Sequence, residues 1–123
     1  MTFKNFGDFI QKKRVEKKVT MRKMADLLEC SAAFLSDVEK DRRNPLDIKR
    51  MEKLADILSL SKEDRTTMFN LAGEKRDTIA PDLPEYIKPR DYVSVALRTA
   101  RDLDADEADW MKFVDDLKKK AKQ

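Results

Sequence analysis

The chain has 123 residues and a formal net charge of +3, which allows one domain or one small domain with an extension. Charged and hydrophobic residues each make up 41%, with only two Gly and four Pro, a mixture typical of helices rather than sheets. The absence of His and the single Cys exclude a Ser-His or Cys-His catalytic pair, an internal disulfide and the usual zinc sites. We therefore expect an all-α protein that is not an enzyme and holds no cofactor or metal.

Charge is distributed unevenly along the chain. Residues 1–62 contain 15 Lys and Arg against 10 Asp and Glu, whereas residues 63–123 contain 12 against 14. A basic first half favours contact with a polyanion, although an ordinary solvated surface of uneven charge is the alternative. No apolar run reaches the ~20 residues that cross a bilayer, and the first residues lack the apolar core of a secretion signal. Together with the single free cysteine, these features predict a cytoplasmic protein without a membrane partner.

Apolar periodicity and capping residues predict five helices in the first part of the chain. Their expected positions are residues 6–18, a helix capped by Thr20, a helix capped by Ser31, residues 47–58, and a helix from Ser61 to Gly73. A loop at residues 41–45 follows the third helix, because Asn-Pro disfavours a continuing helix. These five helices define a predicted domain over residues 1–73.

The composition changes after this domain. Three prolines within residues 77–91 indicate a linker, placed at residues 74–90, with one short helical turn at residues 83–87. A helical hairpin is expected over residues 91–123. Its first helix covers about residues 92–103, and its second begins at an Asp104 cap, with Glu107 in the capping-box position.

Residues 20–39 fit a helix-turn-helix arrangement, in which two short helices are joined by a tight turn and preceded by a stabilising helix. Ala25 is small where the two helices would cross. The apolar positions between them are Leu28, Leu35 and Val38. Ser31 caps the second helix, so the first backbone amides of that helix can point at an anion. Three cations follow this helix: Lys40, Arg42 and Arg43.

Residues 5–73 resemble the Xre/Cro-type helix-turn-helix regulators, which have the five-helix DNA-binding domain of lambda-type phage repressors. The matching residues are Phe6, Ile10, Arg14, Thr20, Ala25, Leu28, Ser31, Leu35, Ser36, Val38, Glu39, the Arg42–Pro45 loop, Leu54, Ala55 and Leu58. The resemblance implies a sequence-specific regulator of transcription, expected to be a homodimeric repressor on a palindromic double-stranded DNA operator. The DNA-binding residues it implies are Thr20, Arg22, Lys23, Ser31, Ala32, Ala33, Ser36, Asp37, Lys40, Arg42 and Arg43. It also implies an ion pair between Arg14 and Glu39.

The sequence departs from the family pattern at three places. Met21 stands where the family frequently has a phosphate-contacting Gln. Glu29 stands where Gly is common, so the turn must take a less favourable backbone conformation or a different path. Ala32 and Ala33 replace long polar residues, which favours thymine-methyl contacts and DNA shape as the source of specificity. Asp37 either accepts a hydrogen bond from cytosine or pairs locally.

The last two predicted helices carry apolar stripes that favour self-association. The expected dimerisation residues are Tyr92, Val93, Leu97, Trp110, Phe113, Val114 and Leu117. The structural alternative is a monomer in which these helices fold back on the helix at residues 47–58. Two functional alternatives remain. One is an antitoxin that binds a toxin protein through these helices, and the other is a protein-interaction module that has lost DNA binding, as Met21, Ala32 and Ala33 would favour.

Overall fold

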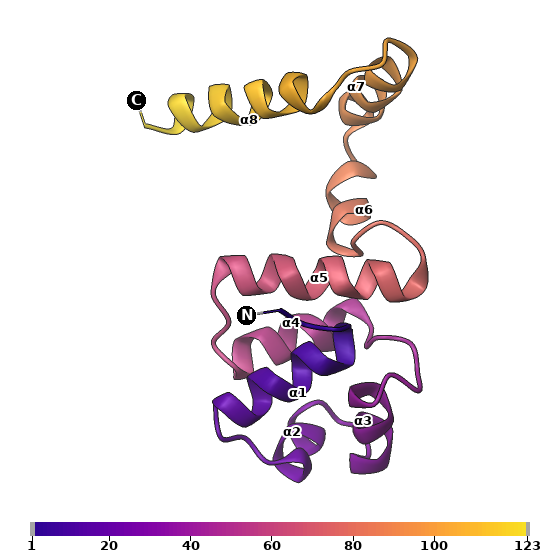
Figure 1. Ribbon diagram of the computed structural model, residues 1–123, viewed down its shortest axis with the longest axis vertical. Coiled ribbons are helices and arrows are strands. Elements are labelled where there is room, and N and C mark those ends of the chain that lie inside the picture. Colours follow the sequence, from indigo (N-terminus) through magenta and orange to yellow (C-terminus); the bar gives the residue numbers. More distant parts are fainter. Residues whose placement is uncertain (1, 123) are drawn as a thin grey trace. The chain divides into compact units, whose positions relative to one another are not determined.

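The computed structural model describes residues 2–122, which form eight helices and no strand (Figure 1). The helices are α1 (Phe6–Glu16), α2 (Met21–Leu27), α3 (Ala32–Glu39), α4 (Ile48–Ile57), α5 (Lys62–Arg76), α6 (Asp82–Ile87), α7 (Asp91–Asp102) and α8 (Glu107–Ala121). The all-α prediction is therefore confirmed. The chain divides into two compact units, residues 1–85 and residues 86–123.

The N-terminal unit has a hydrophobic core to which each of its first five helices contributes. The side chains without measurable exposure are Phe9, Ile10, Met24, Leu35, Met51, Leu54, Ala55, Met68 and Ala72. Burial of one large apolar side chain stabilises the fold by roughly 1.5–3 kcal/mol. Helix α1 packs against both α3 and α5, and Figure 1 shows α2 and α3 at one end of this unit and α5 at the other. Helix α3 is therefore held in place by both α1 and α2.

Helices α1 and α3 approach each other closely at Gly7. A Cβ atom on Gly7 would lie 2.4 Å from the carbonyl oxygen of Val38 and 2.5 Å from that of Glu39. Because no side chain fits in this space, glycine is required for α1 to reach the last turn of α3.

Six helices end with a residue other than glycine in the left-handed region. These residues are Lys18, Glu29, Asp41, Ser59, Asp77 and Asp104, with φ between 48° and 62°. After each of them, the next backbone N–H donates to the carbonyl five residues earlier, which is the Schellman pattern. This conformation costs a residue with a Cβ atom about 1 kcal/mol.

The start of three helices agrees with the predicted caps, because Thr20, Ser31 and Ser61 each accept a hydrogen bond from the first turn of their helix. The predicted end of α5 at Gly73 is wrong, since the helix continues to Arg76. Gly73 instead allows a close approach. A Cβ atom there would lie 2.9 Å from backbone atoms of the two residues at 79–80, where the chain returns over the helix.

The predicted N-cap of α8 is also wrong. Asp106 caps this helix, and the side chain of Asp109 returns the hydrogen bond to close a capping box. Asp104 has a φ of 54° and belongs to the end of α7, where the N–H of Ala105 donates to the carbonyl of Ala100. Asp104 thus belongs to the end of α7, and Asp106 caps the start of α8.

The C-terminal unit has no buried side chain within residues 86–122. Helices α7 and α8 are joined by a short turn, and α8 then extends away from α7 (Figure 1). The exposed fractions of Trp110, Phe113 and Leu117 are 39%, 55% and 50%. No helix among the described residues is long and apolar enough to cross a membrane.

Candidate nucleic-acid interface

At its N-terminal end, helix α3 exposes small side chains. The Ser31 hydroxyl accepts a hydrogen bond from the backbone N–H of Phe34 at 3.0 Å, which fixes the start of the helix. Ala32 and Ala33 are exposed, whereas Leu35 is buried on the opposite face. Thr20 caps the preceding helix in the same way, accepting from the N–H of Lys23 at 3.1 Å. Both short helices therefore begin with their hydroxyl caps formed.

An ion pair joins the first helix to the end of the third. The Arg14 guanidinium donates two hydrogen bonds to the Glu39 carboxylate, at 2.8 Å and 3.0 Å, and a third to the carbonyl of Val19 at 3.0 Å. Glu39 is only 6% exposed and is the one buried charged residue among residues 2–122. The hydrogen bonds to Glu39 raise the pKa of Arg14, against the opposing effect of burial. The pair thus holds α1, the loop before α2, and α3 together.

Two arginines lie beside Asp37 at the edge of α3. Arg42 Nη1 is 3.8 Å and Arg43 Nε is 3.5 Å from the Asp37 carboxylate oxygens. The Arg43 guanidinium also lies 5.2 Å from the centre of the Phe34 ring, within the range of a cation–π contact. The side chains of Arg42 and Arg43 are still 67% and 54% exposed, so both can reach a ligand. Asp37 therefore pairs locally, which is one of the two outcomes that the sequence left open.

The loop that carries these arginines is fastened to α5. Lys75 Nζ lies 3.1 Å from the Asp41 carboxylate and donates to the Asp41 carbonyl at 3.3 Å. Arg76 donates to the carbonyls of Pro45 and Leu46 at 2.8 Å and 2.9 Å. A cationic hollow of about 490 Å³ results, lined by Phe34, Arg42, Arg43, Asn44, Pro45 and Lys75. Lys75 and Arg76 were not predicted from the sequence, where their only signal was two cations in the last turn of a helix.

The turn between α2 and α3 is held by a residue from α4. Arg50 donates to the carbonyl of Leu28 at 2.9 Å and to that of Glu29 at 3.2 Å, at the C-terminal end of α2. Glu29 has a φ of 58°, so the turn takes the less favourable backbone conformation rather than a different path. Cys30, next in the turn, is half-buried, and burial raises the pKa of its thiol. Arg50 was also not predicted from the sequence, and its hydrogen bonds satisfy two carbonyls of this turn.

Residues 10–64 match the protein-family model described as Helix-turn-helix. The match begins within α1, contains all of α2, α3 and α4, and ends within α5. The expected resemblance to the Xre/lambda repressor-like helix-turn-helix family is therefore confirmed over residues 10–64. This family is a DNA-binding regulatory domain. Comparison with curated proteins gave no match, and comparison with solved structures gave none either.

The helix-turn-helix domain brings the predicted DNA-contacting residues together. They lie on α2 and α3, at the N-caps of these two helices and in the segment after α3, at the same end of the domain (Figure 1). The exposed members are Thr20, Arg22, Lys23, Ser31, Ala32, Ala33, Lys40, Arg42 and Arg43, and the half-buried members are Ser36 and Asp37. Met21 is half-buried and packs against the core rather than lying free at the surface. Of the predicted dimerisation residues, Val93 and Val114 are half-buried, and Tyr92, Leu97, Trp110, Phe113 and Leu117 are exposed.

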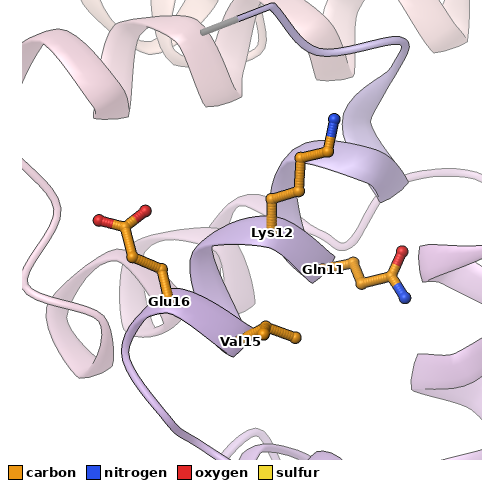
Figure 2. Close-up of a pocket in the computed structure, with 4 residues that line it drawn as sticks. All are labelled: Gln11, Lys12, Val15 and Glu16. Atoms are coloured by element: carbon orange, nitrogen blue, oxygen red, sulfur yellow. The ribbon is translucent and has the colours of Figure 1, made fainter.

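The outer face of α1 in the helix-turn-helix domain carries a separate hollow, of about 590 Å³ (Figure 2). The residues that line it are Gln11, Lys12, Val15 and Glu16, all from one helix. Lys12 is paired with Asp8 at 3.0 Å, and Val15 is exposed. Among the described residues no three His, Cys, Asp or Glu side chains gather as a metal site would require.

Proposed function

We propose that this protein is a sequence-specific DNA-binding regulator of transcription that acts as a homodimeric repressor. Helix α3 enters the major groove, with Ala32, Ala33 and Ser36 facing the base edges. The observation that carries the proposal is the exposed, capped start of α3 with accessible cations around it. Lys23 lies on the preceding helix, and Arg42 and Arg43 lie after α3.

The small side chains on α3 determine how bases are read. Ala32 and Ala33 have no hydrogen-bonding group, so they contact thymine methyl groups and allow a close approach to the groove floor. Ser36 supplies a hydroxyl that donates or accepts. Asp37 is occupied by its two arginines and does not read cytosine. DNA shape then contributes a larger share of specificity than it would beside long polar side chains.

Four cations are assigned to backbone phosphates: Lys23, Lys40, Arg42 and Arg43. Each phosphate that a cation neutralises releases counterions and contributes about 0.9 to the slope of log affinity against log salt. Binding of one domain therefore weakens with salt with a slope of roughly −3.6. The fastening of the arginine loop to α5 supports this assignment, because an ordered loop loses less entropy on binding.

We assign residues 1–73 to DNA binding, residues 74–90 to a linker and residues 91–123 to self-association. The apolar side chains left uncovered on α7 and α8 support the last assignment, since soluble monomers rarely expose such a surface. A homodimer places two recognition helices on a palindromic operator whose half-sites are roughly 34–36 Å apart. Because the two DNA-binding domains are linked in the dimer, its overall affinity for the operator exceeds the affinity of either domain alone.

The experiment is a gel shift of the full chain with the DNA upstream of its own coding region, and with a scrambled DNA of the same composition. We expect the upstream DNA to shift at a protein concentration at least roughly 10³-fold lower than the scrambled DNA requires. Arg43→Ala should weaken both shifts, whereas Lys62→Ala, an exposed change on α5 away from the interface, should leave them unchanged. Absence of any shift at low salt would overturn the proposal in favour of a protein-interaction module.

A second candidate function is that of an antitoxin, favoured by the absence of any buried side chain within residues 86–122. In that case the helix-turn-helix domain still binds DNA, and a toxin covers α7 and α8. Purification of the tagged chain expressed with its neighbouring genes separates the two candidates. A second protein in equal amount supports the antitoxin, and a homodimer alone supports the repressor.

A further inference from the structure

The last turn of α5 reaches the loop that follows α3. Most of α5 lies at the far end of the domain from α2 and α3, but Lys75 and Arg76 both donate hydrogen bonds to this loop (Figure 1). Lys75 lines the same cationic hollow, of about 490 Å³, as Phe34 of α3 and the two arginines Arg42 and Arg43. The hollow thus joins the surface of α3 to the end of α5. The phosphate contacts assigned above include its arginines but not its lysine.

The ammonium group of Lys75 is held in place and still has a donor to offer. Its Nζ atom lies 3.1 Å from the Asp41 carboxylate and donates to the Asp41 carbonyl at 3.3 Å. An ammonium has three N–H donors, so these two contacts leave one for a ligand. The side chain of Lys75 is 30% exposed. An ammonium that is already fixed loses little entropy when it binds a ligand.

The cationic hollow carries more positive than negative charge. Its three cations are touched by two carboxylates, those of Asp37, beside the arginines, and Asp41, beside the lysine. A net positive charge therefore remains. The side chains of Arg42 and Arg43 are more than half exposed, and the exposed amide of Asn44 adds further hydrogen-bond donors. An anionic group with several acceptor oxygens fits this lining.

We propose that Lys75 contacts a phosphate of the DNA backbone, next to the phosphates bound by Arg42 and Arg43. This inference rests on the proposed function. A free phosphate compound would have to be held by the small net charge of the hollow alone, whereas DNA that is docked on α3 brings its phosphate there at high effective concentration. With this fifth contact, the slope of log affinity against log salt for one domain becomes roughly −4.5 instead of −3.6.

The Asp41 carboxylate competes with the phosphate for Lys75. It has the same sign of charge as the phosphate, so it also repels the phosphate directly. Asp41→Asn removes both effects and keeps the backbone, because Asn tolerates the left-handed conformation that Asp41 adopts with a φ of 62°. The hydrogen bond from Lys75 to the carbonyl of residue 41 is retained.

Fluorescence anisotropy of the full chain with the upstream and the scrambled DNA, at salt concentrations from about 50 to 200 mM, tests the contact. Lys75→Met should weaken binding of both DNAs by the same factor, roughly three- to tenfold at the lowest salt, because a phosphate contact carries no sequence information. The slope should fall by about 0.9 for each bound domain. Lys62→Met, the same change at an exposed lysine of α5, should alter neither quantity.

Two results with Lys75→Met would overturn the contact. Weaker binding with an unchanged salt slope would show that Lys75 only fastens the loop to α5. Weaker binding of the upstream DNA alone would show that Lys75 acts by positioning α3. Circular dichroism establishes that each variant keeps its helix content.

A double-mutant cycle with Asp41→Asn separates a direct contact from a general effect of charge. In the wild-type background, Asp41→Asn should strengthen binding by about two- to fivefold at low salt, because it releases the ammonium of Lys75 to the phosphate. In the Lys75→Met background, most of this gain should disappear. Equal gains in the two backgrounds, or no gain in either, would overturn the contact.

Inorganic phosphate distinguishes a free ligand from the DNA backbone. In an NMR titration of the full chain to about 10 mM phosphate at constant ionic strength, the amide signals of residues 42–44 and 75 should show no saturable shift. Saturation that Lys75→Met abolishes would assign the hollow to a free phosphate compound and overturn the DNA contact.

Failure of this inference differs from failure of the proposed function. Wild-type binding with an unchanged slope for Lys75→Met overturns the Lys75 contact alone. Equal affinity of the wild-type chain for the upstream and scrambled DNA overturns sequence reading alone, because the slope is measured with either DNA. No binding of either DNA at low salt overturns both.

Discussion

Arg14, in α1, holds Glu39, at the end of α3, through two hydrogen bonds of 2.8 Å and 3.0 Å. The two residues are 25 positions apart in sequence, and the carboxylate is almost fully buried. A buried charge is stable only when it is paired, so neither residue tolerates loss of the other. The position of α3 therefore depends on α1 as much as on the turn that precedes α3.

Glu39→Ala should lower the free energy of unfolding by roughly 3 kcal/mol, because it leaves the Arg14 guanidinium without its carboxylate. Asp37→Ala, two residues earlier, removes a more exposed ion pair and should cost less than about 1 kcal/mol. Urea unfolding followed by circular dichroism measures both changes. Equal or reversed effects would show that Arg14 and Glu39 are not the pair that stabilises the domain.

Gly7→Ala should destabilise the N-terminal domain by about 1–3 kcal/mol or more. The added methyl group would overlap the carbonyl oxygens of Val38 and Glu39, and α1 would have to move away from α3. Gln11→Ala is the matched control, since Gln11 is exposed on the same helix and its replacement should change stability little. Thermal unfolding of the two variants tests the close approach, and similar melting temperatures would contradict it.

Glu29→Gly should stabilise the domain by about 0.5–1 kcal/mol, because glycine adopts the left-handed conformation of this turn without a steric penalty. The same change at Glu52, exposed within α4, should destabilise by about 1 kcal/mol. Chemical unfolding of both variants gives the comparison. If Glu29→Gly were as destabilising as Glu52→Gly, the turn would not have the backbone conformation described.

Much of the helix-turn-helix domain could be predicted because its signals are local. Thr20, Ser31 and Ser61 are hydroxyl residues directly before apolar periodicity, and each caps a helix as expected. The error at Gly73 has a physical origin, because glycine serves both to end helices and to permit close backbone contacts. Only the return of residues 79–80 over α5 decides between these roles.

The contacts that position the interface could not be predicted in the same way. Arg50, Lys75 and Arg76 donate to carbonyls 21 to 34 residues away, and helical periodicity carries no information about such partners. The aspartates at 104 and 106 were confused because both precede the same apolar run, and only the Schellman hydrogen bond that ends α7 assigns each one. The apolar faces of α7 and α8 could be predicted from the sequence. The sequence pattern of one chain does not identify the second molecule that covers them.

Arg43→Ala should weaken binding to all DNA sequences alike and lower the slope of log affinity against log salt by about one unit. Asp37→Asn should instead strengthen binding and increase this slope. It removes a negative charge beside the phosphates and releases Arg42 and Arg43 from their pairing. Fluorescence anisotropy titrations between 50 mM and 200 mM salt measure both slopes. An unchanged affinity and slope for Arg43→Ala would remove this residue from the phosphate contacts.

Selection from a random pool of double-stranded DNA tests whether the N-terminal domain reads a DNA sequence. The full chain is incubated with the pool, and the bound and input DNA are sequenced. We expect enrichment of one motif with two inverted half-sites, which contain thymine at the positions that Ala32 and Ala33 face. A bound fraction with the same sequence distribution as the input, or no bound DNA at low salt, would contradict it.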